Sequence, residues 1–444
     1  MKLEEQLIFE KYMTVVNEGG AAGHMKHPFD LPDVNTFDDL VNVFYGAIEK
    51  LDKGTSSVKL DGVNLSLKVV PDENNKTFKR QFALDRGSQK EIDVRGITVT
   101  TLTDRFPEGH GMLEKGKTIL SIMNNAMPEI VNDLKKLGMW NDSTKFINTE
   151  YIEGKENVID YNLLKKDGNA KIIAFHGINQ FVEKANRKGE RTRPGLKPRP
   201  NIKETSRSIN YDSEALQSLR EKVKPVAEEY GFDVITNIYA QKKGVPNLES
   251  ALSSTFTVLK NGGEPETKPI KQWIKELPVL PDLSEKLSMK DGKKRGAVSK
   301  DVYMSVLNAQ TPLSDLFEED DITTAIAGAL TYHVTRILGN EILRNYTTED
   351  YGDTNQHEGI VITDVEYGKD DFGNPNSIKI TGDFIVDGMG GSFATNRAPA
   401  SDEEDQSAPA VNYGGGKMDF SSYFSNPRSS KDPGGTGFKG KVVK

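Results

Sequence analysis

The sequence predicts an α+β protein in which a strand-rich core is interrupted by a helical insertion. Apolar residues alternate with polar ones in several segments before residue 185 and again after residue 350, which is the period of a strand. The stretch between them has mostly helical spacing. From about Met389 the chain is rich in Gly, Ser, Asn, Pro and acidic residues, a composition that cannot bury enough apolar surface to fold alone.

Three helical regions are expected in the first part of the chain. Residues 3–17 carry apolar side chains near helical spacing, and a second helix begins after a cap at Asn35 or Thr36. Residues 112–138 also have a helical pattern, with a break at Pro128 because proline removes a backbone donor.

Strands are expected around these helices. Alternation runs from Ser56 to Val70, and "KTFKRQFALDRG" is a plausible antiparallel partner across the turn "PDENN". The segments "KFINTEYIEG" and "AKIIAFHGINQFV" are expected to form the next strands. "HEGIVITDVEY" and "NSIKITGDFIV" are expected to form the last ones.

These patterns divide the chain into five parts. They are an N-terminal helical segment (1–54), the first part of the core (55–185), a basic linker with a mainly helical insertion (186–350), the last core strands (351–388) and a low-complexity tail (389–444).

Composition limits the classes of protein to which the chain can belong. The chain has 444 residues, no cysteine and a formal net charge of −8. Disulfides, thiolate zinc sites and a cysteine nucleophile are therefore excluded. The negative charge argues against a protein that coats nucleic acid, so a polyanion site would need a local basic surface. The basic segment 184–203 is either a linker or such a surface. The chain has no apolar run near 18 residues, so a soluble, cytoplasmic protein is expected.

An ordered set of short motifs accompanies this pattern. Lys59-Leu60-Asp61-Gly62 fits Lys-x-Asp-Gly, a pattern that roughly one chain in four to ten of this size carries by chance. Its weight comes from the residues that follow in order, which are Arg86, Glu150, Phe175, Glu358 and Lys379.

In this order the motifs resemble those of the covalent nucleotidyltransferase superfamily, which comprises ATP-dependent DNA and RNA ligases and mRNA capping enzymes. Those families share a Lys-x-Asp-Gly motif, an aromatic-flanked Glu, a Phe-Asp-Ile-like strand, a Glu-Gly-hydrophobic-Val strand and a final lysine-rich strand. The resemblance covers about residues 55–185 and 355–388. It implies a nucleotidyltransferase core (ATP-grasp-like) of antiparallel sheets with flanking helices.

The resemblance implies that Lys59 attacks the α-phosphate of ATP and holds AMP as a phosphoramidate. An amine attacks phosphorus only when neutral, so the pKa of Lys59 would have to fall from about 10.4 through desolvation and neighbouring positive charge. Lys379, together with Mg²⁺ or Mn²⁺, would neutralise charge on the α-phosphate oxygens. Glu358 would coordinate or orient the metal, because hard cations prefer carboxylate oxygens.

The remaining motif residues are expected to bind the nucleotide. Glu150 would accept hydrogen bonds from the ribose hydroxyls, and Phe175 would stack on the purine. Arg86 would contact phosphate through its forked guanidinium, on the nucleotide or on the acceptor end. Asp61 and Gly62 would contact the nucleotide from the turn that follows the lysine.

Each of these residues also has a structural interpretation. Lys59 could be an exposed strand lysine, and the two glutamates could be solvated carboxylates at strand edges. Arg86 could cap a turn. Phe175 could belong to the core, in which case His176 is the alternative for the contact with the base.

Three features depart from the family pattern. The last motif usually has two lysines separated by one residue, whereas Thr381 stands at the second position here. Lys369, just upstream, is a candidate substitute. The stretch between the Phe-Asp-Ile-like strand and the Glu-Gly strand is longer than the family norm. No room is expected after the last strand for the C-terminal oligonucleotide-binding barrel of DNA ligases and capping enzymes.

The combined pattern favours an ATP-dependent polynucleotide ligase that joins 5′-phosphate and 3′-hydroxyl ends. "KLDGVNLSL" looks more like the lysine motif of phage RNA ligases than that of DNA ligases, so RNA ends are favoured over DNA ends as partners and no membrane partner is expected. A phage-encoded protein would act in the host cytoplasm. A DNA ligase or another nucleotidyltransferase is the first alternative. The second is a nucleotide- or nucleic-acid-binding protein without turnover, such as a virion component.

Overall fold

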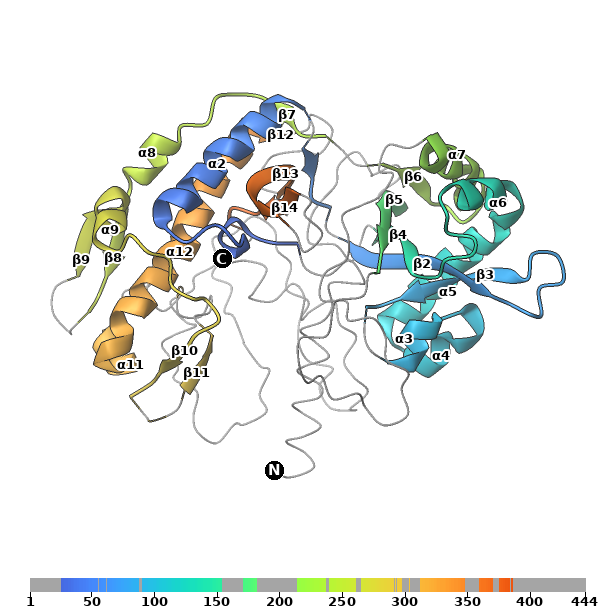
Figure 1. Cartoon of the computed structure of the whole chain (residues 1–444), viewed down its shortest axis with the longest axis horizontal. Coiled ribbons are helices and arrows are strands. Elements are labelled where there is room, and N and C mark those ends of the chain that lie inside the picture. Colours follow the sequence, from blue (N-terminus) through green and yellow to red (C-terminus); the bar gives the residue numbers. More distant parts are fainter. Residues whose placement is uncertain are drawn as a thin grey trace, which may run out of the picture.

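The computed structural model consists of two lobes (Figure 1). It describes residues 25–54, 56–60, 62–87, 90–153, 171–181, 214–236, 239–260, 265–290, 292, 294–297, 303, 312–347, 359–369, 375–383 and 385. We call the described part of residues 62–236 the sheet lobe, on the right in Figure 1, and the described parts of 25–58 and 239–385 the helix lobe, on the left. Lys59 and Leu60 connect the two.

The fold class is α+β, with mainly antiparallel sheets and flanking helices, and this part of the prediction is confirmed. The described residues form one five-stranded sheet, one three-stranded sheet and three two-stranded sheets.

The sheet lobe is built on the five-stranded sheet, whose order is β3-β2-β4-β5-β6. Neighbouring strands are antiparallel except for the parallel pair β5–β6. The strands are β2 (Val63–Pro71), β3 (Arg80–Asp85), β4 (Lys145–Glu153), β5 (Lys171–Gln180) and β6 (Asp233–Ile235). The helices are α3 (Glu91–Arg95), η2 (Val99–Thr101), α4 (Leu102–Arg105), α5 (Gly111–Asn125), α6 (Met127–Lys136) and α7 (Glu214–Glu229).

The two faces of this sheet differ in chemistry. Leu65, Leu67, Ile147 and Ile173 belong to a buried apolar cluster that includes residues of α5, α6 and α7. Because successive strand residues point to opposite faces, the residues between them point away from these helices. Several of those residues are polar, and we call this side the polar face.

Local signals explain the elements of the sheet lobe. The β2–β3 hairpin turns at the predicted "PDENN" segment. Helix α5 ends at Asn125 and α6 begins at Met127, so the predicted break at Pro128 is confirmed. Proline is tolerated there because the first turn of a helix needs no backbone donor.

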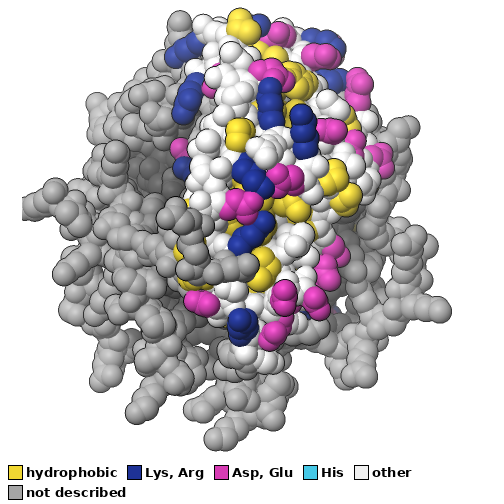
Figure 2. Space-filling view, turned by 90° about the vertical axis from the view of Figure 1, so that its left-hand side faces the viewer, with side chains coloured by type: hydrophobic (Ala, Val, Ile, Leu, Met, Phe, Trp, Pro, Cys, Tyr) yellow, Lys and Arg dark blue, Asp and Glu magenta, His cyan; other side chains and the backbone are white. Residues whose placement is uncertain are grey.

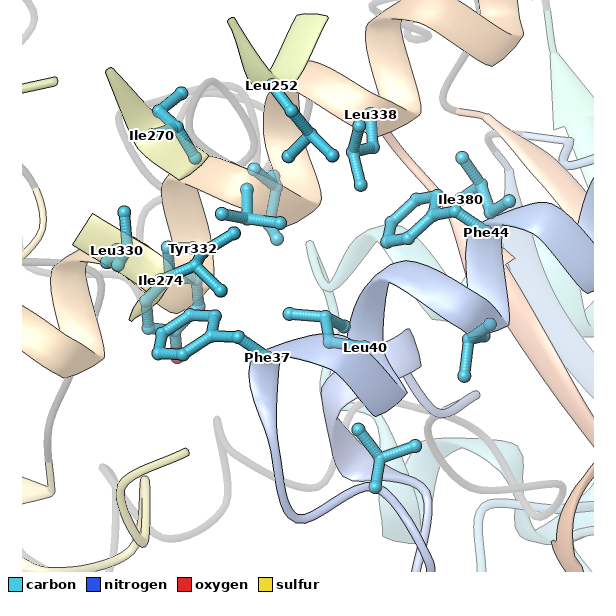
Figure 3. Packing of buried hydrophobic residues seen from close by; sticks show 14 of the residues in the cluster. Phe37, Leu40, Phe44, Leu252, Ile270, Ile274, Leu330, Tyr332, Leu338 and Ile380 are labelled. Atoms are coloured by element: carbon cyan, nitrogen blue, oxygen red, sulfur yellow. The ribbon is translucent and has the colours of Figure 1, made fainter. Parts of the chain in front are cut away.

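The helix lobe is centred on the 27-residue helix α12 (Glu319–Asn345). Every residue of α12 from Ala325 to Thr335 is buried, because elements pack around it on all sides. Helix α2 (Phe37–Asp52) and the paired strands β13 (Ile360–Lys369) and β14 (Pro375–Ile380) share one apolar cluster with it. Figure 3 shows Phe37, Phe44, Leu338 and Ile380 within this cluster.

The other elements of the helix lobe are small. They are η1 (Pro28–Asp30), β1 (Ser57–Val58), β7 (Gln241–Lys242), α8 (Leu248–Leu252), β8 (Thr255–Val258), β9 (Glu266–Pro269), α9 (Ile270–Glu276), β10 (Lys286–Ser288), β11 (Lys294–Ala297), α11 (Leu313–Leu316), β12 (Tyr346–Thr347), β13 (Ile360–Lys369) and β14 (Pro375–Ile380).

Helix α2 begins with the predicted cap. The Thr36 side chain accepts a hydrogen bond from the Asp39 N–H at 3.0 Å, and the Asp39 carboxylate accepts one from the Thr36 N–H at 2.9 Å. This reciprocal arrangement satisfies two backbone donors at the helix start. The hydrogen bond from the Thr36 hydroxyl also lowers the pKa of the Asp39 carboxyl.

The described chain divides at other positions than those expected from the sequence. Within the expected insertion (186–350), α7 and β6 join the sheet lobe, whereas α8 to α12 join the helix lobe. The last strands, β13 and β14, form a sheet with β1, in which β13 is the central strand, and they do not join the five-stranded sheet. The expected helix at 3–17 and the tail (389–444) lie outside the described residues.

None of the helices among the described residues combines the length and apolar character needed to cross a lipid bilayer.

Candidate functional site

Polar side chains line the polar face where β2, β4 and β5 adjoin. Asn64 lies opposite Glu150 in the β2–β4 register, and Ser66 lies opposite Asn148. His176 on β5 reaches the same face, with its Nε2 3.7 Å from Glu150 Oε2. Ser66 is fully buried, and its hydroxyl has no hydrogen-bond partner within the described part of the chain.

The turn that carries the Lys-x-Asp-Gly motif is held against Glu150. The Gly62 N–H donates to Glu150 Oε1 at 3.1 Å, and the Asn64 amide lies 3.5 Å from Glu150 Oε2. The Asn64 amide also donates to Asn148 Oδ1 at 2.6 Å. The Glu150 side chain is 12% exposed, so it remains accessible while these donors fix its direction. Asp61 lies outside the described residues.

Gly62 must be a glycine for this contact to form. A Cβ at position 62 would lie 2.8 Å from Tyr151 O, 2.8 Å from Ile152 Cγ1 and 2.9 Å from Glu150 Cγ. These distances are shorter than real Cβ contacts. The glycine therefore allows the backbone of the motif to lie directly on β4.

Lys59 is placed by the helix lobe, although its motif contacts the sheet lobe. Its backbone N–H donates to Gly359 O at 2.8 Å, which extends the β1–β13 ladder by one residue. Val58 is buried and pairs with Ile360, a member of the apolar cluster of the helix lobe. Because paired residues share a face and neighbours alternate, the half-buried Lys59 lies on the opposite face of the three-stranded sheet.

Lys379 on β14 lies on that same face. The register aligns Ser57 with Val361 and Val361 with Lys379, while the next residue, Ile380, is in the apolar cluster. Lys59 and Lys379 are therefore on one face of the sheet, with strand β13 between them. That the two lysines act at one site stays a prediction.

An N-terminal segment borders Lys379. The Lys379 N–H donates to Lys26 O at 2.9 Å, and the Asp30 carboxylate accepts from the His27 N–H at 2.9 Å. Burial raises the pKa of Asp30, and the His27 N–H and the charges of Lys379 and Lys26 oppose this effect. Lys379 thus has the Asp30 carboxyl group as a charged neighbour.

Arg86 lies at the end of β3, beside the polar face. Its Nη1 donates to Asn64 O at 2.7 Å, and the following Gly87 N–H donates to Asp85 Oδ1 at 2.8 Å. Arg86 is half-buried.

Phe175 does not lie where a stacking residue is needed. It is 1% exposed and belongs to the apolar cluster beneath α5, α6 and α7, on the face opposite Glu150. The predicted contact of Phe175 with a purine is therefore wrong, because its ring is covered by the core. His176, the alternative named from the sequence, lies on the polar face beside Glu150.

The predicted metal ligand, Glu358, lies outside the described residues, next to Gly359. Within the described ranges, no group of three or more His, Asp or Glu side chains is arranged to hold a metal ion. Glu150 is the carboxylate that the polar face offers beside the lysine turn.

Two pockets of the described chain lie away from this site. The larger, of about 480 Å³, lies beside the start of α5 and is lined by residues that include Tyr151, Lys171 and Phe232. Tyr151 points to the helix-covered side of β4, so this pocket does not adjoin Glu150. The candidate site is defined by its converging polar side chains.

The outer face of the helix lobe carries interspersed charges of both signs (Figure 2). Lys260 lies 2.8 Å from Glu266, and Lys268 lies 2.5 Å from Glu276. A surface that carries charges of both signs lacks the net positive charge to which nucleic-acid phosphates bind. This face therefore does not extend the candidate site.

The polar face contains residues that the motif pattern did not single out. Asn64, Ser66 and Asn148 lie on the same face as Glu150, and the signal for them is alternation, because Asn64 and Ser66 are two apart, as are Asn148 and Glu150. Together these groups can accept and donate hydrogen bonds to hydroxyl groups or a heterocyclic ring.

Comparison of the chain with protein-family models, with curated proteins and with solved structures finds no match.

Proposed function

We propose that the chain is an ATP-dependent polynucleotide ligase of RNA-ligase type, which carries AMP on Lys59 during the reaction. In this proposal the two lobes together form a nucleotidyltransferase core. The nucleotide binds between the polar face and the face of the three-stranded sheet that carries Lys59 and Lys379.

One observation carries the proposal: motif residues that are far apart in the sequence lie close together. Gly62 of the lysine motif donates to Glu150 at 3.1 Å, although 88 residues separate them. The β1–β13–β14 register brings Lys379 to the same sheet face as Lys59. A chance Lys-x-Asp-Gly match gives no reason for these residues to meet.

In the first step, the neutral Lys59 Nζ attacks the α-phosphorus of ATP. A P–N bond forms, the bond from the α-phosphorus to the bridging oxygen breaks, and pyrophosphate leaves. Lys379 stabilises the charge that develops on the α-phosphate oxygens. Glu150 accepts hydrogen bonds from the ribose, and the His176 ring contacts the base. A Mg²⁺ or Mn²⁺ ion would add further charge neutralisation, with Glu358 as its expected ligand.

In the following steps, AMP moves to the 5′-phosphate of a nucleic acid end. An oxygen of that phosphate attacks the phosphoramidate, so the P–N bond breaks and a pyrophosphate linkage forms. A 3′-hydroxyl then attacks the 5′-phosphate, a phosphodiester forms and AMP leaves. Arg86 would contact one of these phosphates through its forked guanidinium.

A second candidate is a nucleotide- or nucleic-acid-binding protein that has lost turnover. Thr381 stands where the families usually carry a second lysine. It is 3% exposed, and within the described chain its hydroxyl has no hydrogen-bond partner. A buried neutral side chain cannot replace the missing positive charge, so this position favours the second candidate.

Incubation with ATP and Mg²⁺ or Mn²⁺, followed by intact-mass measurement, separates the two candidates. The proposed ligase gains one AMP, Lys59→Ala gains none, and Lys53→Ala gains as much as the wild type. Lys53 is a matched control because it is an exposed lysine at the end of α2. Binding of ATP without an adduct under either metal would support the second candidate and refute the ligase.

The nucleic acid substrate needs a separate assay. Nicked duplexes with RNA or DNA strands, and single-stranded ends of each type, are sealed in parallel. Preferential sealing of RNA ends is expected. Equal or faster sealing of all-DNA nicks would favour the DNA ligase alternative.

A further inference from the structure

A buried ion pair lies next to the candidate site. Lys68 Nζ is 2.7 Å from Asp85 Oδ2, and the two side chains are 2% and 0% exposed. Lys68 also donates to Asp93 O at 3.0 Å and to Val94 O at 2.8 Å, so all three ammonium protons have acceptors. Removing two charges from water has a desolvation cost that can exceed the attraction between them. The presence of a buried ion pair is therefore, by itself, weak evidence that these two residues serve only to stabilise the fold.

The ion pair is connected to the turn that carries Arg86. Asp85 uses one oxygen for Lys68 and the other to accept from the Gly87 N–H at 2.8 Å. Gly87 has a φ of 73°, a conformation that favours glycine. Arg86 stands between these two residues, so its backbone is fixed from both sides.

The same connection continues to Glu150. The Arg86 guanidinium donates to Asn64 O at 2.7 Å, and the Asn64 amide lies 3.5 Å from Glu150 Oε2. Gly96 leaves room for the lysine stem, because a Cβ at that position would lie 3.0 Å from Lys68 Cε. The ion pair and the two carbonyl acceptors hold the Lys68 ammonium beside Asp85.

We propose that Lys68 and Asp85 are positioning residues, which hold the Arg86 guanidinium at the candidate site so that it can bind a phosphate group. This inference rests on the proposed function, in which Arg86 contacts the phosphate of ATP or that of the nucleic acid end. The ion pair itself touches neither substrate, and it acts through the Gly87 N–H and the turn.

Two double variants separate positioning from stability. Lys68→Met with Asp85→Asn removes both charges but leaves a side-chain oxygen that can accept from the Gly87 N–H. Lys68→Met with Asp85→Val removes both charges and that acceptor. Replacing a buried ion pair by uncharged groups avoids leaving one charge unpaired. Urea unfolding establishes that each variant is folded.

Three readouts are compared with Arg86→Ala. Hydrogen exchange at the Gly87 amide reports on the turn itself and requires no activity. The rate of AMP-adduct formation from ATP reports on a nucleotide phosphate, and sealing of a pre-adenylylated 5′ end reports on the acceptor phosphate. These last two arms identify which phosphate Arg86 binds.

The Asn double variant is expected to keep Gly87 protection and the wild-type rates. The Val double variant is expected to lose that protection and to slow one of the two steps by on the order of 10-fold to 100-fold. Because positioning acts through Arg86, adding the Val double substitution to Arg86→Ala should slow that step no further.

Equal rates in the Asn and Val double variants would overturn the inference, as would full additivity with Arg86→Ala. A wild-type protein that forms no AMP adduct would instead refute the proposed ligase. In that case the positioning of the turn is still decided by Gly87 exchange, because unchanged protection in the Val double variant would refute it.

Discussion

Replacing Gly62 by alanine should push the lysine turn away from Glu150. The new Cβ would lie 2.8 Å from Tyr151 O and from Ile152 Cγ1, whereas ordinary contact begins at 3.4 Å, so the turn must move by about 0.6 Å (3.4 − 2.8). A misplacement of about 1 Å can cost on the order of 100-fold in rate, so we expect AMP-adduct formation to slow by roughly 10-fold to 100-fold. The overpacking should also lower the free energy of unfolding by about 1–3 kcal/mol.

The assay combines the initial rate of adduct formation, measured by intact mass at saturating ATP, with urea unfolding. Gly46→Ala is the matched control, because nothing lies within 4 Å of a Cβ at that position on α2. Alanine is the better helix former by about 0.5–1 kcal/mol, so this control should be slightly more stable than the wild type and react at the same rate.

A Gly62→Ala protein with unchanged stability and rate would refute the close approach of the lysine motif to β4. If Gly62→Ala loses stability and the wild type forms no adduct, the contact between the motif and β4 is supported and only the proposed chemistry is refuted.

Three further changes test other parts of the structure. Burial and the charge of Arg336 lower the pKa of His333 from 6.5 to about 4. As the pH falls, His333 is therefore protonated in the unfolded chain before it is protonated in the folded protein. The free energy of unfolding should consequently fall by up to about 3 kcal/mol as the pH is lowered from 6.5 to 4. His333→Phe should remove that part of the slope in urea titrations across this pH range, and an unchanged slope would contradict the burial of a neutral imidazole. Gly359→Ala should lower the free energy of unfolding by about 3 kcal/mol, since the φ of Gly359 is 143° and a Cβ at this position would overlap the backbone of β14. A melting temperature equal to that of the wild type would argue against the β13–β14 register. Glu150→Ala should speed hydrogen exchange at the Gly62 amide while Glu150→Gln, which keeps an acceptor oxygen, should not, and equal exchange in both would mean that the two residues do not meet.

Features with local causes could be predicted from the sequence. The Thr36 cap, the helix break at Pro128 and the strands around Glu150 each depend on residues within one short segment. The α+β class follows from these same segments. The nearness of Gly62 and Glu150 was expected only because the order of the motifs resembles a known family.

The face on which a strand residue lies was harder to predict. Strand β5 has a register irregularity where it passes Asn148 and Thr149 of β4. As a result, Phe175 and Ile178 both lie in the core although they are three residues apart. Simple alternation fails across such a bulge, and so the sequence alone could not decide between Phe175 and His176.

The division into lobes could not be predicted for a different reason. Helix α12 is buried on all sides over its central turns, so its sequence has no polar face to show how it packs. The pairing of β1 with β13 joins residues about 300 positions apart. Contacts of that range leave no periodic signal in either segment.

The core of the helix lobe is formed by segments that are synthesised at widely separated times. Helix α2 ends at Asp52, whereas α12, which packs in the same cluster, begins at Glu319. At roughly 5–20 residues per second, tens of seconds of synthesis separate the two. The sheet lobe is complete by residue 236 and can form its core during this interval. During this interval α2 lacks its partner α12, so the apolar side chains of Phe37, Leu40 and Phe44 are not yet covered by it. This makes α2 the segment that a chaperone would bind during translation.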